Sequence, residues 1–325
     1  WDYIIVGSGS AGSVLAERLT ASGRHKVLLL EAGGSDRHLR YRVPALCTAC
    51  IGNPEADWMF LSDPDPSRAD RVDMVSRGKV LGGSSSINGI IYVRGNRGDY
   101  DGWAQMGNTG WDYDTMLGHF RSIGTNRDGV TDVYGTGGGV TVGELRGAPK
   151  LSHVFVEAMA ELGYPRNPGY NSEAGEGASI AHATQQMGWR SSAAKGFLRP
   201  AMKRPNLKVE TGAEAERLVM EGRRAVGVRY RVDGTLREAR AAGEVIVAAS
   251  SINSPKLLML SGIGPAGDLS ALGIEVLHDL PGVGRNLQDH PAAHVKALVN
   301  RRTTNMDDNF LGRIRHGIRF ATTMS

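Results

Sequence analysis

The first 31 residues of the chain predict a strand, a glycine-rich turn, a helix and a second strand in immediate succession. Residues 3–6 are apolar and largely β-branched, and the helix that follows carries Val14, Leu15 and Leu19 at helical spacing. Residues 26–30 form a second apolar run. A strand, a helix and a second strand in this order make a βαβ unit, which favours an α/β fold with a parallel sheet.

The turn between the first strand and the helix has the sequence Gly-Ser-Gly-Ser-Ala-Gly, residues 7–12. Gly7 permits a tight turn, Gly9 lets a pyrophosphate approach the backbone, and Gly12 lets the helix pack closely on the strand. The anion would bind the free N–H groups of the helix N-terminus. Glu31 ends the second strand about twenty residues later, where its carboxylate can accept hydrogen bonds from a ribose diol. These features predict a dinucleotide site without separating NAD from FAD.

Composition excludes several classes of protein. The chain has 325 residues, 41% hydrophobic and 22% charged, which suits a globular protein of two domains. The net charge of +4 is small and the basic residues form no tract, so we expect no nucleic-acid partner. The sequence contains no run that approaches 18 apolar residues, so we expect no transmembrane helix. Because the chain starts at Trp1, we expect that its N-terminus is trimmed or incomplete, so any targeting signal is invisible. We expect a cytoplasmic location.

Cys47 and Cys50, the only cysteines, are spaced Cys-Thr-Ala-Cys. A zinc site needs four ligands and a second cysteine pair does not exist, so we expect no metal. Two interpretations stay open, a redox dithiol of the kind found in flavin disulfide reductases and two unpaired thiols in a covering loop.

Two further segments predict contact with a ligand. Residues 35–75 lose periodicity and collect prolines and aspartates, which indicates a long ordered excursion over the first domain. Residues 77–89 form a second glycine- and serine-rich turn before the apolar stretch 90–93. Its small residues allow close approach of the backbone to a flat ligand, and its N–H and hydroxyl groups suit a phosphate or a heteroaromatic edge.

The remaining elements follow from hydrophobic periodicity. We expect helices over 111–123, 152–162 and 191–202, and a domain boundary within 124–139. Residues 207–232 alternate apolar and polar positions and predict antiparallel sheet, with a hairpin turn at Asp233 and Gly234. Residues 244–249 predict a strand buried on both faces, leading into a helix with Pro255 near its first turn.

With these segments in view, the chain resembles the glucose–methanol–choline (GMC) oxidoreductases, and bacterial members such as hydroxymethylfurfural oxidases and choline dehydrogenases in particular. Three motifs carry the resemblance: residues 7–12 with Glu31-Ala32-Gly33-Gly34, residues 78–88 with Tyr92 and Gly95, and residues 250–255 closing on Ser261-Gly262-Ile263-Gly264. The second and third match the two diagnostic signatures of the family at every fixed position.

By this resemblance the cofactor is FAD, bound non-covalently because Ile87 stands where some members carry a flavin-linking histidine. The resemblance implies that residues 7–12 hold the pyrophosphate and Glu31 the ribose, that residues 41–75 form a lid, and that residues 76–95 contact the flavin. The cofactor-binding residues so implied are Gly7, Ser8, Gly9, Ser10, Ala11, Gly12, Glu31, Ala32, Gly82, Gly83, Ser84, Ser85, Asn88, Gly89, Ala215 and Ser250.

The resemblance also implies the reaction. A base takes the hydroxyl proton of a primary alcohol while hydride passes to flavin N5, giving an aldehyde, and the electrons then pass to oxygen, a quinone or another acceptor. The catalytic histidine of the family lies in a C-terminal part, and the resemblance covers only about the first three fifths of the family. We therefore expect no catalytic residue in this chain, and interpret His290 and His294, separated by Pro291, as structural.

The expected architecture is a Rossmann-like FAD-binding domain, residues 1–138 and 205–285, with a discontinuous antiparallel-sheet substrate domain, residues 139–204 and 286–325, which continues beyond residue 325. Two alternative functions remain. One is a flavin disulfide oxidoreductase using Cys47 and Cys50, which would need a second dinucleotide fingerprint for NADPH. The other is a catalytically incomplete FAD-binding fragment.

Overall fold

A computed structural model describes residues 1–126, 133–171, 175–290, 292–301 and 303–323. The chain forms two compact units, Trp1–Asn88 with Ser192–Ala292, and Gly89–Ser191 with Ala293–Ser325. The chain therefore passes between units at 88/89, 191/192 and 292/293, whereas the sequence predicted domain limits at 138/139, 204/205 and 285/286. The assignment of one domain to FAD and the other to substrate stays a prediction.

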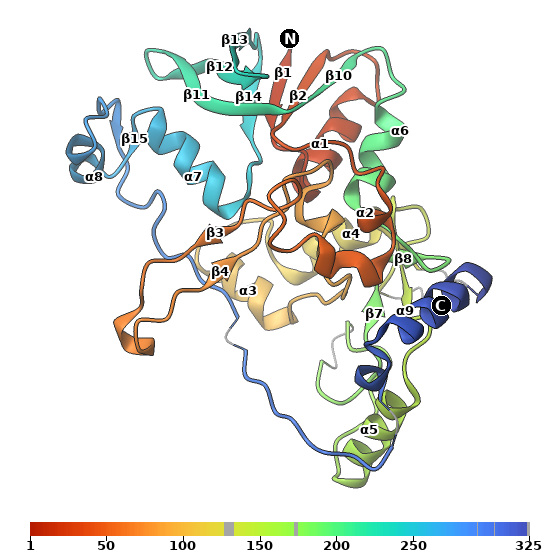
Figure 1. The fold of residues 1–325 in the computed structure, drawn as a ribbon. Coiled ribbons are helices and arrows are strands. Elements are labelled where there is room, and N and C mark those ends of the chain that lie inside the picture. The colour runs from red at the N-terminus through yellow and green to blue at the C-terminus, as the bar shows by residue number, and fades with distance from the viewer. Residues whose placement is uncertain (127–132, 172–174, 291, 302, 324–325) are drawn as a thin grey trace. The chain divides into compact units, whose positions relative to one another are not determined.

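The first unit is built on a parallel sheet of four described strands in the order β10-β2-β1-β14 (Figure 1). Ile5 of β1 pairs with Leu29 of β2 on one side and with Ile246 of β14 on the other. Helix α1 connects β1 to β2, so the predicted βαβ unit is confirmed. The bounds are β1 Tyr3–Val6, α1 Ser10–Thr20, β2 Val27–Glu31, β10 Leu207–Thr211 and β14 Glu244–Val247.

The two outer strands of this sheet differ from expectation. β10 pairs parallel with β2, so the predicted antiparallel pairing of this strand is wrong. The alternating pattern indicates that one face is buried, but it does not indicate the direction of the neighbouring strand. β14 was expected to be buried on both faces, but it is the last strand in the described sheet and its apolar residues are only partly buried. A strand with a neighbour on one side only keeps part of its surface open even when its sequence is apolar.

Hydrophobic clusters cover both faces of the parallel sheet. Side chains alternate along each strand, so Ile4 and Val6 enter one cluster while Ile5 enters the other. The first cluster packs under an antiparallel sheet of β11 Ala213–Glu221, β12 Arg224–Val232 and β13 Thr235–Arg240. The second packs under α1, η4 Ala194–Leu198 and α6 Arg199–Ala201.

Two predicted turns of the first unit can be compared directly. The hairpin between β12 and β13 is confirmed, with Asp233 at φ 49° and Gly234 at φ 76°. Helix α7 Ser250–Leu260 follows β14 as expected, but Pro255 lies inside it and not near its first turn. The unit ends with β15 Ile263–Gly264, α8 Ala266–Ala271 and β16 His278–Asp279.

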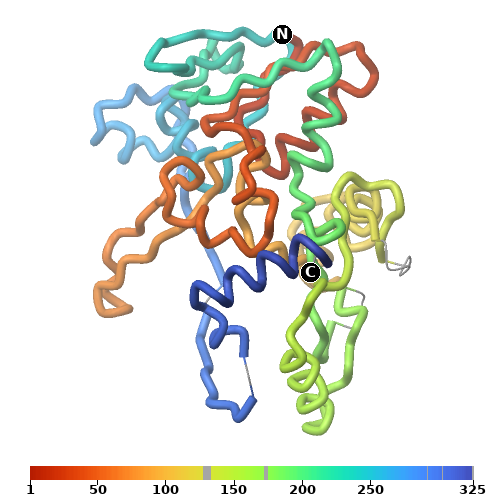
Figure 2. Tube along the Cα trace, turned by 45° about the vertical axis from the view of Figure 1, so that its right-hand side comes forward, coloured from red at the N-terminus to blue at the C-terminus, as the bar shows by residue number. Residues whose placement is uncertain are grey.

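Residues 41–75, the covering segment, are ordered around a small core of their own. Tyr41, Cys50 and Ala56 pack with Val80 and Ile87. The hairpin β3/β4 extends away from this core in both views (Figures 1 and 2). The elements of this region are α2 Leu39–Arg42, η1 Pro44–Ala49, β3 Phe60–Leu61, η2 Pro66–Arg68, β4 Met74–Val75 and η3 Gly83–Ser86.

The second unit combines short strands with longer helices. Its three-stranded sheet is mixed and not purely antiparallel, since β6 pairs parallel with β5 and antiparallel with β7. The expected helices over 111–123 and 152–162 are confirmed as α4 and α5. The elements are α3 Arg97–Gln105, α4 Tyr113–Ile123, β5 Gly124–Asn126, β6 Val140–Glu144, α5 Lys150–Glu161, β7 His182–Ala183, β8 Gln185–Gln186, β9 Trp189–Arg190, η5 Thr304–Asp307 and α9 Phe310–Thr323.

A buried arginine organises the interior of the second unit. The Arg94 guanidinium donates to the carbonyl oxygen of Val133 at 2.5 Å and lies over the rings of Tyr92, Phe120 and Tyr134. The hydroxyl of Tyr134 in turn lies 2.7 Å from Nδ1 of His182.

Among the described helices of the whole chain, none has the length and hydropathy needed to cross a membrane.

Candidate cofactor site

The turn after β1 closes so tightly that two of its positions accept only glycine. Gly7 has φ +98°, and a Cβ there would lie 2.5 Å from the carbonyl oxygen of Ala248. A Cβ on Gly12 would lie 1.9 Å from the carbonyl oxygen of Gly7. Both distances are far below van der Waals contact, so the predicted roles of Gly7 in the turn and of Gly12 in helix packing are confirmed.

Gly9 is different, because a Cβ on it would meet no atom within 4 Å. Gly9 is also the N-cap of α1, and no side chain of the described residues caps this helix end. The first N–H groups of α1 therefore keep their donor capacity beside open space. Space at Gly9 that a side chain would fill, next to uncapped helix donors, is the arrangement that a bound phosphate requires.

A cavity of about 710 Å³ opens at this turn, entirely within the first unit. Its size lies in the range of small-molecule and cofactor sites. Ten of the predicted cofactor-binding residues line it: Gly7, Gly9, Ser10, Ala11, Glu31, Ala32, Gly83, Ser84, Ala215 and Ser250. The cavity thus lies at the carboxyl ends of β1, β2 and β14, where α1 and α7 begin. In α/β folds, ligands bind at this edge of the parallel sheet.

Glu31 is buried at the cavity wall, and hydrogen bonds from Ser8 and Gly33 hold its carboxyl group. Its Oε2 accepts hydrogen bonds from the backbone N–H of Ser8 at 2.9 Å and from the Ser8 hydroxyl at 2.6 Å. Its Oε1 accepts from the N–H of Gly33 at 2.8 Å. Burial raises the pKa of the Glu31 carboxyl above its usual range, and these hydrogen bonds lower it in part. Oε1 retains acceptor capacity, which a ribose hydroxyl can use.

Six predicted residues are outside the cavity lining of the described chain. Ser8 orients Glu31, and Gly12 packs the helix. A Cβ on Gly82 would meet Ser86 Oγ at 2.4 Å, and Ser85 Oγ accepts from the N–H of Ala193 at 3.0 Å. Asn88 is exposed, and Gly89 is the first residue of the second unit. A direct contact of these six with the cofactor stays a prediction.

The second glycine-rich turn packs directly on the first. A Cβ on Gly83, which has φ +54°, would lie 2.8 Å from Cα of Gly9. The N–H of Gly82 donates to the carbonyl oxygen of Ser8 at 3.1 Å. Two turns that are some 75 residues apart in the sequence therefore share one wall of the cavity.

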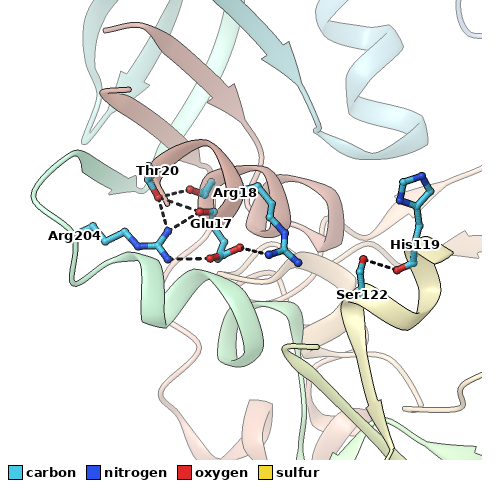
Figure 3. A network of polar contacts seen from close by, with 7 residues as sticks. Glu17, Arg18, Thr20, His119, Ser122 and Arg204 are labelled. Atoms are coloured by element: carbon cyan, nitrogen blue, oxygen red, sulfur yellow. Dashed lines mark hydrogen bonds and ion pairs between the residues drawn. The ribbon is translucent and has the colours of Figure 1, made fainter. Parts of the chain in front are cut away.

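Helix α1 is fixed at its far end by an arginine from another segment (Figure 3). Arg204 Nη1 donates to the carbonyl oxygen of Glu17 at 2.5 Å and to Thr20 Oγ1 at 2.9 Å, while Nη2 donates to Glu17 Oε1 at 2.9 Å. Cations near a helix C-terminus interact favourably with the helix dipole. This anchor holds α1 so that its N-terminus stays at the cavity.

Trp58 and Arg77 also line the cavity, although the sequence placed them only within the predicted lid and the predicted flavin-contact range and did not single them out. Trp58 lies in an irregular part of the covering segment, and Arg77 is the first residue of the second glycine-rich turn, so periodicity gives no signal for either. The signal in the sequence was their position, with Trp58 inside the long segment 35–75 and Arg77 at the start of the second turn.

The cysteines and histidines considered for other chemistries are not in the cavity lining of the described chain. Cys50 is buried, with its Sγ 3.5 Å from the carbonyl oxygen of Arg40, and neither cysteine is in the cavity lining of the described chain. His290 and His294 are exposed and irregular in conformation. The described residues contain no group of three or more His, Cys, Asp or Glu side chains able to hold a metal ion.

Comparison with known proteins agrees with this geometry. Residues 1–292 match the family described as GMC oxidoreductase. An oxygen-dependent choline dehydrogenase of Brucella anthropi is 45% identical over 295 residues, covering 91% of this chain and 54% of the relative. Another from Brucella suis biovar 1 is 43% identical over 318 residues, covering 98% of this chain and 58% of the relative. The chain thus spans somewhat more than half the length of these relatives.

Solved structures show the same likeness. An FAD-dependent oxidoreductase from Chaetomium thermophilum has a TM-score of 0.87 at 29% identity and covers 100% of this chain and 59% of its own. Pyridoxine 4-oxidase from Mesorbium loti has a TM-score of 0.82 at 33% identity and covers 86% of this chain and 55% of its own. With the family match extending over nearly the whole chain, this protein belongs to the GMC oxidoreductase family.

Proposed function

We propose that the full-length protein containing this chain oxidises a primary alcohol to an aldehyde with non-covalently bound FAD as cofactor. The observation that carries the proposal is the cavity in which open space at Gly9, uncapped donors of α1 and the Glu31 carboxylate face the same volume. A diphosphate carries the negative charge that the helix N-terminus attracts, and an adjacent ribose has hydroxyl groups that can donate to the carboxylate.

Within this chain, the work is binding and orientation. The α1 N-terminus and the backbone at Gly9 would hold the diphosphate, Glu31 the ribose diol, and the Gly83–Ser84 backbone the flavin part of the molecule. FAD, when bound, supplies the two-electron acceptor for the alcohol. Ile87 is buried in the core of the covering segment and offers no nucleophile, which supports a non-covalent complex.

The substrate class rests on family membership and on the similar proteins. Choline and pyridoxine, after which two of these proteins are named, are primary alcohols, and we infer a small primary alcohol here as well. By resemblance to the family, we place the catalytic base in a part of the full-length protein outside this chain. Oxygen is the acceptor that the curated relatives' names favour; another acceptor, such as a quinone, and a cytoplasmic location stay predictions.

The disulfide alternative is not supported, because the cysteine pair does not reach the cavity in the described chain. The test of the proposed function is anaerobic mixing of the full-length holoprotein with a panel of primary alcohols while the flavin absorbance is followed. We expect bleaching by at least one primary alcohol and re-oxidation on admitting air. A flavin that no alcohol bleaches, but that a dithiol does, would overturn the assignment.

A further inference from the structure

The covering segment turns back on itself around one buried carboxylate. Asp57 is 2% exposed. Its Oδ1 accepts hydrogen bonds from the backbone N–H of Met59 at 3.0 Å and of Arg77 at 2.9 Å, and its Oδ2 accepts from the N–H of Gly52 at 3.0 Å. Three backbone positions spread over 25 residues therefore converge on a single side chain.

One of these contacts holds an unfavourable backbone conformation. Met59 has φ 52°, in the left-handed region that side chains with a Cβ rarely adopt. Such a conformation persists only where its surroundings impose it. The Asp57 carboxylate accepts a hydrogen bond from the Met59 N–H and so holds this conformation next to Trp58.

The backbone around Asp57 ties the covering segment to the end of β2. The N–H of Trp58 donates to the carbonyl oxygen of Arg77 at 2.9 Å, and the N–H of Lys79 donates to that of Ala56 at 2.8 Å. Val80 then bridges to Gly34, just past the end of β2. The segment thus reaches the cavity through a short backbone ladder with Asp57 at its centre.

Trp58 is the residue that this ladder presents to the cavity, beside Arg77. Lys79 Nζ lies 4.8 Å from the centre of the Trp58 ring, and the Phe60 ring lies parallel to it at 5.9 Å. These contacts fix the plane of the indole. A flat aromatic wall held in one orientation suits the ring and ribityl surface of a dinucleotide.

We propose that Trp58 is a cofactor-contacting residue and that Asp57 is the positioning residue that holds it against bound FAD. The inference rests on the proposed function, since it takes FAD as the occupant of the cavity. It predicts that the covering segment controls the rate of FAD release, whereas the glycine turn provides the binding surface itself.

The test measures FAD dissociation from the full-length holoprotein, by dilution into a scavenger of free flavin, for the variants Asp57→Ala, Asp57→Asn, Trp58→Ala and Trp58→Phe. We expect Asp57→Ala and Trp58→Ala each to release FAD at least about tenfold faster. Asp57→Asn keeps the Oδ1 acceptor and should be intermediate, and Trp58→Phe keeps an aromatic wall and should restore slow release. Asp63→Ala, an exposed aspartate of the same segment, is the matched control.

The double variant separates positioning from general stability. If Asp57 acts through Trp58, the Asp57→Ala, Trp58→Ala protein releases FAD no faster than the quicker single variant. Rates that multiply, or single variants that release FAD at the wild-type rate, would overturn the inference. A wild-type protein without FAD would instead overturn the proposed function, and is detected before any variant is made.

Discussion

The glycine turn, residues 7–12, and the covering segment, residues 41–75, line the same cavity but are held in different ways. The turn depends on backbone against backbone, with Gly12 facing the carbonyl oxygen of Gly7. The covering segment depends on one carboxylate, Asp57, that gathers three backbone N–H groups. The first arrangement tolerates no added atom at Gly7 or Gly12, whereas the second depends on an ionised carboxylate.

The largest effect is expected at Gly12. In Gly12→Val the added Cβ would overlap the Gly7 carbonyl, so the turn and helix must separate, and we expect a loss of about 3 kcal/mol or more in unfolding free energy. Urea unfolding with and without added FAD measures it. Gly98→Ala in α3, where a Cβ meets nothing within 4 Å, is the control and should be neutral or stabilising by up to about 1 kcal/mol. Equal stability of both variants would refute the packing role.

The next effect is expected at Gly9, and it should fall on binding alone. Because a Cβ there points into open space and only the N-cap preference of α1 is lost, Gly9→Val should change the stability of the FAD-free protein by less than about 1 kcal/mol. Its side chain would occupy the diphosphate position, so FAD affinity should fall at least about a hundredfold, or ~2.7 kcal/mol. Flavin titration checks this. Wild-type affinity in this variant would mean that the diphosphate lies elsewhere.

A smaller, pH-dependent effect is expected at Asp57. Burial alone would raise the pKa of Asp57, but the backbone donors of Gly52, Met59 and Arg77 together hold it below its usual range. A carboxyl with a depressed folded-state pKa stabilises the fold above its unfolded pKa, near 4, and this contribution is lost as the pH falls through the folded pKa.

The unfolding free energy of the wild type should therefore exceed that of Asp57→Asn by about 1 kcal/mol at pH 7, and the difference should shrink below about pH 4. Denaturant unfolding across this range gives the comparison. Asp63→Asn, on the exposed part of the same segment, should show no such trend. A difference between wild type and Asp57→Asn that stays constant with pH would show that the ionised carboxylate is not what holds the segment.

The smallest effect is expected for the cysteines, which lie in the covering segment but outside the described cavity lining. The double variant Cys47→Ser, Cys50→Ser, in the full-length protein, should retain its FAD and oxidise alcohols near the parent rate. Steady-state turnover tests this. A loss of more than about tenfold, or ~1.4 kcal/mol of barrier, with FAD retained would revive the dithiol mechanism.

The same contrast explains which parts of the site could be predicted from sequence. Gly7, Gly9, Gly12 and Glu31 follow from local spacing, because strand, turn and helix are set by neighbours along the chain. Trp58 reaches the cavity through contacts between residues 52, 59 and 77 with one carboxylate, and no local pattern encodes such convergence.

The errors in the fold have a similar origin. The alternation in residues 207–211 correctly indicated a strand with one buried face, yet the direction of pairing depends on β2, which lies far away in sequence. The apolar run 244–247 correctly indicated a strand, but its place at the end of the described sheet is a matter of topology. Periodicity reports burial and element type, and it carries no information about which strand becomes a neighbour.

The cofactor site is tested most directly by a native mass spectrum of the purified full-length protein, followed by the spectrum of the same sample after acid denaturation. We predict that each folded chain carries the added mass of one FAD, and that the denatured polypeptide has lost all of it, because Ile87 provides no point of attachment. A folded protein without FAD would contradict the cofactor site, and flavin that remains on the denatured polypeptide would contradict the non-covalent complex.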